Sequence, residues 1–265
     1  SLHAALTQSY PAYEAIGVRN PGGEYNQMGT SLLQIENEFY GTIRPKRVIA
    51  SGERPLHALR ERGVEYVEVR LMDLNPFVPV GIDAPTMRLL DVFLLHCLLS
   101  DSPPDTPEEI TELQHNQHLT AARGREPGLR LRRQGKTVPL SDWAAQVLDE
   151  CLPLAARLDA QHGNSDYSAA LAAARALVDA PEQTPSARVL QALAGAHGNS
   201  FIDFTLAQSR RTHDALLGLP WSAEQQARQS ALAEASLAAK KAIEDSDTLE
   251  FEAWRQHYMA ASGLL

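Results

Sequence analysis

The chain has 265 residues and 44 % hydrophobic content, which is enough for one large folded domain or two small ones. Its formal net charge of −9 argues against a nucleic-acid partner, because that role needs a concentrated basic surface. The apolar run at residues 89–99 contains Asp91 and His96 and is far shorter than the ~20 residues of a membrane span. Two cysteines are too few for a disulfide framework, so the sequence predicts a reduced, cytoplasmic protein with no membrane or nucleic-acid partner.

The first third of the chain holds nearly all of the β-strand signal. A helix that ends at Gly17 precedes a first strand at residues 31–40, where polar and apolar residues alternate. Ser51 is a plausible N-cap for a short helix, with Pro55 in its first turn and Gly63 just past its end. A second strand is expected at residues 64–72.

From Asp83 onward the pattern is helical. Asp83 is typical of a helix N-cap, and Thr106 with Glu109 three residues later forms a capping-box pattern. A short hairpin is expected within residues 124–140. Other helices are expected at about 141–162, 166–179, 186–196, 200–217, 222–244 and 248–261. Cys97 lies in an apolar run and is expected to be buried.

These patterns predict an α+β fold. Residues 1–80 form a β-containing portion and residues 81–265 form a helical portion that packs on it, so that the two make one domain.

Polar side chains share one face of each predicted strand. On the second strand Glu68 and Arg70 lie together, opposite the apolar Val67, Val69 and Leu71. Carboxylates bind Mg²⁺, and arginine binds phosphoryl oxygens in a bidentate geometry, so a cleft lined by both faces favours nucleotide-dependent phosphoryl chemistry. Strand spacing alone favours the simpler interpretation, in which Glu68 and Arg70 form a solvated ion pair.

A pair of histidines, His115 and His118, has the spacing of two metal ligands on one helix face. No third ligand is evident, so we interpret them as exposed histidines on a polar helix.

Four sequence blocks closely resemble the bacterial single-chain type of glutamate–cysteine ligase. They are Gln34-Ile35-Glu36-Asn37-Glu38-Phe39-Tyr40, Ile43-Arg44-Pro45-Lys46-Arg47, Glu65-Tyr66-Val67-Glu68-Val69-Arg70 and Asp73-Leu74-Asn75-Pro76-Phe77. Their order and spacing also match. Weaker similarity continues at residues 124–129 and 184–190.

The resemblance implies a fold and a reaction. The fold would be related to glutamine synthetase, with a curved antiparallel sheet around the active site. The reaction would be ATP-dependent ligation of the γ-carboxylate of L-glutamate to L-cysteine through a γ-glutamyl phosphate, the first step of glutathione biosynthesis. Mg²⁺, with Mn²⁺ as an alternative, would serve as cofactor.

The resemblance also implies roles for individual residues. Glu68 matches a metal ligand of the family, and Arg70 matches a catalytic arginine that contacts the transferred phosphate. Tyr40 matches a residue of the cysteine pocket, with a half-buried aromatic as the alternative. Arg44, Lys46 and Arg47 would contact nucleotide phosphates or pair with neighbouring carboxylates. The roles of Glu36, Asn37 and Glu38 stay open.

Family members are about twice as long as this chain, which resembles their C-terminal half. Most of the metal ligands and part of the cysteine pocket would then lie in an N-terminal half, so we expect the isolated chain to be inactive and to expose an unpaired sheet edge. Two alternatives stay open: a carboxylate–amine ligase with another amine acceptor, and a non-catalytic helical interaction module.

Overall fold

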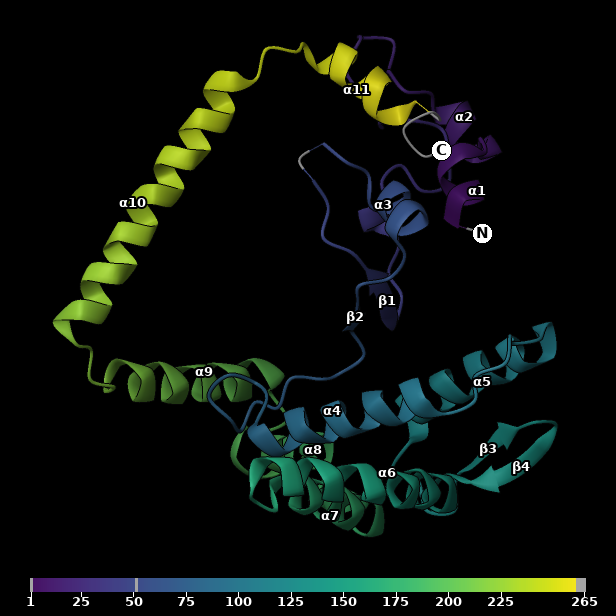
Figure 1. Ribbon diagram of the computed structural model, residues 1–265, viewed down its shortest axis with the longest axis vertical. Helices are drawn as coiled ribbons and strands as arrows, with labels where there is room; N and C mark the ends of the chain where they lie inside the picture. Colours follow the sequence, from purple (N-terminus) through teal and green to yellow (C-terminus); the bar gives the residue numbers. More distant parts are fainter. Residues whose placement is uncertain (1, 51, 261–265) are drawn as a thin grey trace. The chain divides into compact units, whose positions relative to one another are not determined.

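The computed structural model describes residues 2–50 and 52–260, which form two compact units (Figure 1). Unit 1 combines the chain up to Asp73 with the chain from Trp221 onward, and unit 2 is Leu74–Pro220. The sequence had assigned residues 221 onward to the helical portion, whereas the structure groups them with the β-containing portion.

Unit 1 begins with two short helices, α1 (Leu2–Thr7) and α2 (Pro11–Ile16). The second ends at Gly17 as expected, where a φ of 73° suits a residue without a Cβ atom. Helix α3 (Pro55–Arg62) also ends at its predicted glycine, Gly63. Its N-cap position is occupied by Arg54, while the predicted cap Ser51 lies outside the described residues.

The predicted strand at residues 31–40 is wrong. This segment contains only an isolated bridge at Ser31 and a 3-10 helix, η1 (Glu36–Glu38). Side chains of this segment bond to nearby backbone amides: Glu38 Oε2 accepts from the Gln34 amide at 2.7 Å, and Gln34 Oε1 accepts from the Gly29 amide at 3.3 Å. Such local bonds compete with a sheet ladder, which explains why alternating polarity was misleading here.

The sheet of unit 1 has two antiparallel strands, β1 (Ile43–Lys46) and β2 (Tyr66–Val69). Strand β2 confirms the core of the prediction for residues 64–72, while no strand was predicted at the position of β1. The register places Arg44 opposite Glu68 and Lys46 opposite Tyr66. Directly opposed residues of an antiparallel pair project from the same face, so Arg44, Lys46 and Glu68 lie on one face of the sheet, although the Arg44 side chain bonds the Glu36 carbonyl.

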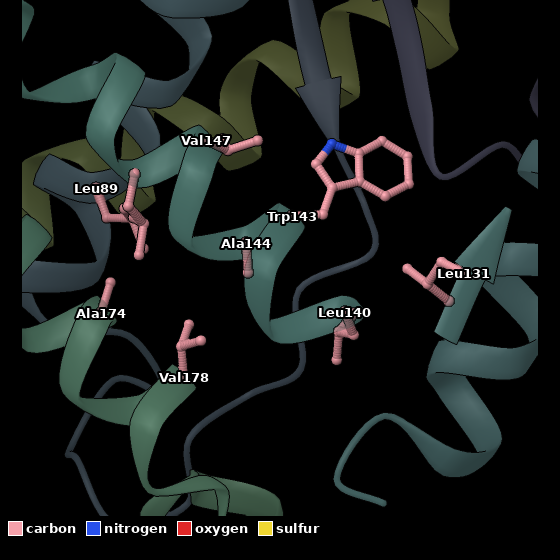
Figure 2. Close-up of a pocket in the computed structure, with 9 residues that line it drawn as sticks. Leu89, Leu131, Leu140, Trp143, Ala144, Val147, Ala174 and Val178 are labelled. Carbon is pink, nitrogen blue, oxygen red and sulfur yellow. The ribbon is translucent and has the colours of Figure 1, made fainter. Parts of the chain in front are cut away.

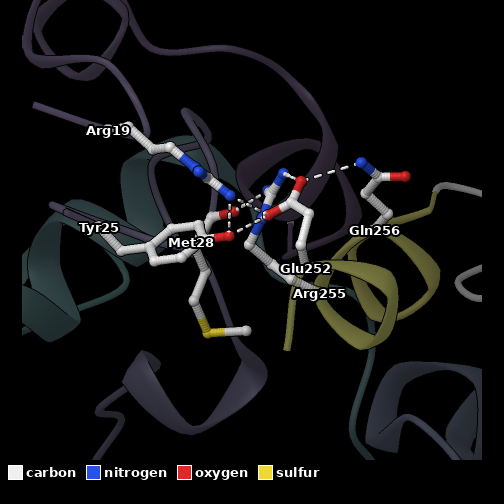
Figure 3. A network of polar contacts seen from close by, with 6 residues as sticks. All are labelled: Arg19, Tyr25, Met28, Glu252, Arg255 and Gln256. Atoms are coloured by element: carbon white, nitrogen blue, oxygen red, sulfur yellow. Dashed lines mark hydrogen bonds and ion pairs between the residues drawn. The ribbon is translucent and has the colours of Figure 1, made fainter. Parts of the chain in front are cut away.

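Two further helices complete unit 1. Helix α10 (Ala223–Ser246) has the capping box of Ser222 and Gln225, and α11 (Phe251–Met259) follows it. Helix α11 is bound to residues 19–28 by a polar network centred on Glu252 (Figure 3). Glu252 accepts hydrogen bonds from Arg255 at 2.7 and 2.9 Å, from Gln256 at 2.9 Å, and from the Tyr25 hydroxyl. Arg255 in turn donates to the Met28 carbonyl at 2.6 Å.

The hydrogen bonds from Arg255 hold the pKa of Glu252 well below its usual range. A carboxylate with a lowered folded-state pKa stabilises the fold above its unfolded pKa of about 4.3 and loses that contribution as the pH falls further. We therefore expect faster hydrogen exchange in residues 251–259 as the pH is lowered below about 4.3, after correction for the intrinsic exchange rate. The Glu252→Gln variant should show the faster exchange already at neutral pH.

The matched control for this prediction is Gln256→Ala, which removes only one exposed hydrogen bond to Glu252. Its exchange should stay close to that of the unmodified chain. Unchanged protection of residues 251–259 in Glu252→Gln would show that the network does not hold α11 in place.

Unit 2 is helical apart from one hairpin. Its helices are α4 (Ala84–Leu99), α5 (Pro107–Arg123), α6 (Leu140–His162), α7 (Asp166–Asp179), α8 (Pro185–Ala196) and α9 (Phe201–Leu217), with a short 3-10 helix, η2 (Pro181–Gln183). The hairpin pairs β3 (Arg130–Arg133) with β4 (Lys136–Pro139). Every predicted helix of this region and the hairpin are confirmed to within a few residues.

Local capping explains this agreement. Asp83 accepts a hydrogen bond from the Thr86 amide at 3.0 Å, and Thr106 accepts one from the Glu109 amide at 3.2 Å. Gly163 ends α6 in the left-handed conformation with a φ of 67°. Each signal involves residues within one helical turn, so it can be recognised without knowledge of tertiary contacts.

The core of unit 2 lies among α4, α6 and α7. Val92, Cys151, Ala155 and Leu171 are buried there, with partly buried leucines and Val147 packed against them. The prediction for Cys97 is wrong, since it is exposed and Cys151 is the buried cysteine. Within the part of the chain that the structure describes, no helix is both long and apolar enough to cross a membrane.

Candidate functional site

Three of the predicted site residues lie together on the β1–β2 sheet. Glu68 Oε1 lies 3.1 Å from Arg70 Nε, and Glu68 Oε2 lies 3.4 Å from Lys46 Nζ. The antiparallel pairing positions them, because the Arg70 amide donates to the Thr42 carbonyl at 2.8 Å just beyond the end of the ladder. The site is thus a carboxylate between two cations.

One oxygen of Glu68 is only partly engaged within the fold. Its Oε2 atom is buried and accepts no hydrogen bond, although Lys46 lies close enough for an ion pair. Arg70 and then Lys46 hold the pKa of Glu68 below its usual value despite partial desolvation. The carboxylate is therefore ionised at neutral pH, as a metal ligand or an electrostatic partner must be.

Tyr40 lies near this cluster and is the most accessible of the predicted residues. Its side chain is 83 % exposed, and the Arg70 guanidinium carbon is 5.8 Å from its ring centroid. An exposed ring near a cation fits a surface that a ligand would cover. Its role in a cysteine pocket stays a prediction.

The side chains of the other two predicted phosphate contacts bond to backbone carbonyls. Arg44 is only 7 % exposed and donates to the Glu36 carbonyl at 3.1 Å. Arg47 donates to the carbonyls of Arg62 and Gly63 at 2.5 and 3.3 Å. The structure thus brings Lys46, but not Arg44 or Arg47, to the Glu68 carboxylate.

Unit 1 contains a buried ion pair that was not predicted from the sequence. Glu36 and Arg54 are 2 % and 4 % exposed, and Arg54 Nη2 is 2.8 Å from Glu36 Oε2. The sequence block at residues 34–40 contains Glu36, but nothing local indicates its partner 18 residues later. A strand at residues 31–40 would put Glu36 and Tyr40 on one face, whereas Glu36 is buried and Tyr40 is exposed.

The residues present fit a metal site in which this chain supplies only some of the ligands. Among the described residues no group of three His, Cys, Asp or Glu side chains is arranged to hold a metal ion. His115 and His118 are both exposed on α5. Glu68 alone fits the way Mg²⁺ is bound in nucleotide enzymes, through one or two carboxylates with substrate phosphates and water.

Unit 2 contains a different kind of feature, an apolar hollow of about 380 Å³ (Figure 2). Leu89, Leu131, Leu140, Val147 and Val178 line it, and Trp143 stands at one side. Its lining offers no carboxylate, hydroxyl or cation that catalysis would require. The candidate site is therefore the Lys46–Glu68–Arg70 cluster of unit 1.

Comparisons with known proteins agree with the sequence blocks. Residues 1–120 match the family model described as glutamate-cysteine ligase. A glutamate–cysteine ligase of Pseudomonas paraeruginosa is 46 % identical over 261 residues, which are 98 % of this chain and 49 % of that protein. A glutamate–cysteine ligase of Bordetella parapertussis is 46 % identical over 263 residues, with the same shares covered.

A solved structure agrees as well. The glutamate–cysteine ligase of Francisella tularensis in complex with AMP has a TM-score of 0.89 and 32 % sequence identity, over 98 % of this chain and 51 % of that chain. The fold of this chain thus corresponds to part of a glutamate–cysteine ligase structure. The chain belongs to the glutamate–cysteine ligase family. It spans about half the length of the curated relatives it matches, which is consistent with the C-terminal half expected from its motifs.

Proposed function

We propose that this chain supplies phosphoryl-transfer residues for the ATP-dependent ligation of L-glutamate to L-cysteine. The observation that carries this proposal is the Lys46–Glu68–Arg70 cluster, which lies within the region that the family model matches. The AMP complex of the Francisella relative supports an adenine nucleotide as the other substrate. The product would be γ-glutamylcysteine, the first intermediate of glutathione biosynthesis, and the reaction would take place in the cytoplasm.

The reaction needs activation of a poor electrophile. The γ-carboxylate of glutamate attacks the γ-phosphorus of ATP, and ADP leaves with the electron pair of the broken P–O bond. The cysteine amine then attacks the acyl carbon, and phosphate leaves as the amide bond forms and the amine loses a proton. Arg70 would donate to the transferred phosphoryl group and neutralise charge that develops there. Lys46 would add a second positive charge beside the same carboxylate.

Glu68 would hold Mg²⁺, or Mn²⁺ in its place, through its Oε2 atom. The metal would neutralise phosphate charge when it is bound. Glu68 would supply one carboxylate, and Mg²⁺ in sites of this kind also takes substrate phosphates and water as ligands. We therefore infer that substrate phosphates, water and residues from the rest of the relatives' length would complete the coordination.

The β1–β2 pair would form part of a curved antiparallel sheet of the glutamine-synthetase type. In unit 1 the apolar face of this pair is not covered, since Val67 and Leu71 are 45 % and 60 % exposed. The remaining half of the enzyme would extend this sheet at its edges, cover its apolar face and bring the acceptor pocket to Tyr40. The chain by itself would therefore lack ligase activity.

The proposal is tested by joining this chain to the half of the Pseudomonas paraeruginosa relative that the match leaves uncovered. We expect ADP release with Mg²⁺ and ATP to require both glutamate and cysteine, while the 265-residue chain alone releases none. ADP release with other amines but not cysteine would identify a ligase with a different acceptor. No release with any amine, despite a correctly folded protein, would contradict the ligase proposal and favour the non-catalytic module.

A further inference from the structure

The buried pair of Glu36 and Arg54 is a feature of unit 1 that the proposed chemistry does not use. Three nitrogen–oxygen contacts join the two side chains, at 3.1, 3.3 and 2.8 Å. Glu36 Oε1 also lies 3.4 Å from the Leu56 amide at the start of α3, where the helix dipole favours a carboxylate. Charges buried to this extent are costly unless their geometry is closely matched, so the pair is tightly fixed.

The pair is connected to the candidate site through the backbone of Glu36. Its carbonyl oxygen accepts the hydrogen bond from the buried side chain of Arg44 on β1. Arg44 lies opposite Glu68 in the ladder, and Lys46 follows on the same face of β1. A shift of Glu36 would therefore move β1, and with it the position of Lys46 relative to Glu68.

Helix α11 also contacts the pair, through Tyr258. Arg54 Nη1 donates to the Tyr258 carbonyl at 3.0 Å, and the guanidinium lies over the Tyr258 ring at 4.5 Å from its centroid. The helix is itself held by Glu252 and Arg255, as described above (Figure 3). Arg54 thus donates to a carboxylate and a carbonyl, and its guanidinium also lies against an aromatic ring.

We propose that Glu36 and Arg54 are positioning residues, which, with Tyr258, fix β1 so that Lys46 meets the Glu68 carboxylate beside Arg70. This inference rests on the proposed function, because it assigns a purpose to the geometry of the phosphoryl-transfer cluster. Small displacements of reacting groups have large kinetic effects, since misplacement by about 1 Å can lower a rate about 100-fold. Neither Glu36 nor Arg54 touches the cluster, so their effect passes through Arg44 and the strand.

The test uses Arg54→Lys, which keeps the buried positive charge but lacks the planar group that bonds Glu36 and Tyr258 together. In the ligase completed with the Pseudomonas half, we expect kcat to fall at least about tenfold, with KM for glutamate within about twofold. In the 265-residue chain alone, hydrogen exchange should become faster in residues 43–46 and 66–69 and stay unchanged in α6 and α7. Both measurements are made well below the melting temperature of the variant, which is determined separately.

Two variants at Tyr258 test the same proposal in case Arg54→Lys does not fold. Tyr258→Phe keeps the ring under the guanidinium and the backbone carbonyl, so it should behave like the unmodified protein. Tyr258→Leu removes the ring alone and should shift kcat and exchange in the same direction as Arg54→Lys, by a smaller factor.

The outcomes separate this inference from the proposed function. Glu68→Gln is measured alongside, as a change within the site itself. If Glu68→Gln lowers kcat while Arg54→Lys and Tyr258→Leu only lower the melting temperature, the pair is structural and the positioning proposal is overturned. If Glu68→Gln also leaves kcat unchanged, the proposed site is wrong and the positioning proposal fails with it.

Discussion

Replacing Arg70 with alanine is expected to lower kcat of the completed ligase by about 10³-fold. An arginine that neutralises charge on a transferring phosphoryl group contributes about 10³- to 10⁵-fold to the rate. The low end applies here, because Lys46 retains a positive charge on the other side of Glu68. The fold should survive, since Arg70 contributes to the ladder only through its backbone amide, which bonds the Thr42 carbonyl. Single-turnover ADP release measures the effect on the phosphoryl step directly.

Two further variants help to interpret the expected fall in kcat of Arg70→Ala. Arg70→Lys keeps the charge without the forked donor geometry, so an intermediate rate would assign part of the effect to bidentate contact. Arg123→Ala removes an exposed arginine of unit 2 that pairs only with Glu126 on the surface, and it should leave kcat unchanged. An Arg70→Ala enzyme with the full rate would show that Arg70 is merely the ion-pair partner of Glu68.

The helices and turns of unit 2 were predictable because their signals are local. Thr106 and Asp83 each accept a hydrogen bond from an amide three residues later, and both residue types favour this position. The hairpin between β3 and β4 turns at Gln134 and Gly135, which both have positive φ. A two-residue turn of this kind matches the twist of the paired strands.

The segment around Glu36 could not be predicted because its structure depends on distant residues. The alternation of Leu33, Gln34 and Ile35 is that of a strand, but Gln34 bonds to the local backbone and Glu36 pairs with Arg54. Arg54 in turn is held by Tyr258, near the other end of the chain. Periodicity contains no information about such partners, so the 3-10 helix and the buried pair appear only in the structure.

Only part of the candidate site could be predicted, because some of its side chains depend on partners that are distant in the sequence. That Glu68 and Arg70 share one face follows from strand periodicity, and their 3.1 Å contact confirms it. Arg44 and Arg47 looked equivalent to Lys46 in the sequence, since all three belong to one basic run. The structure separates them, because Arg44 faces the Glu36 carbonyl and Arg47 faces the end of α3.

Changing Glu36 to glutamine is expected to lower the free energy of unfolding of unit 1 by about 3–5 kcal/mol. Removing one partner of a buried pair leaves the other charge without compensation, and this cost is typical. Arg54 would keep the Tyr258 carbonyl and ring, but neither neutralises its charge. Urea unfolding of the 265-residue chain measures the change, with Trp254 as the probe in a background where Trp143 and Trp221 are phenylalanine.

The double variant Glu36→Leu with Arg54→Met measures the net contribution of the pair to stability. The single variants measure instead the penalty of leaving one buried charge without its partner. Well-packed apolar residues often replace a buried ion pair with little loss of stability, so the double variant should be more stable than either single change. The same variant should nevertheless lose the connection between Tyr258 and the Glu36 backbone, and with it the protection of β1 from hydrogen exchange. Equal stability of Glu36→Gln and the unmodified chain would show that solvent reaches Arg54 in solution. A stable double variant with an unprotected β1 would instead show that the pair is dispensable for stability. It would also show that the pair is needed to hold Lys46 in position.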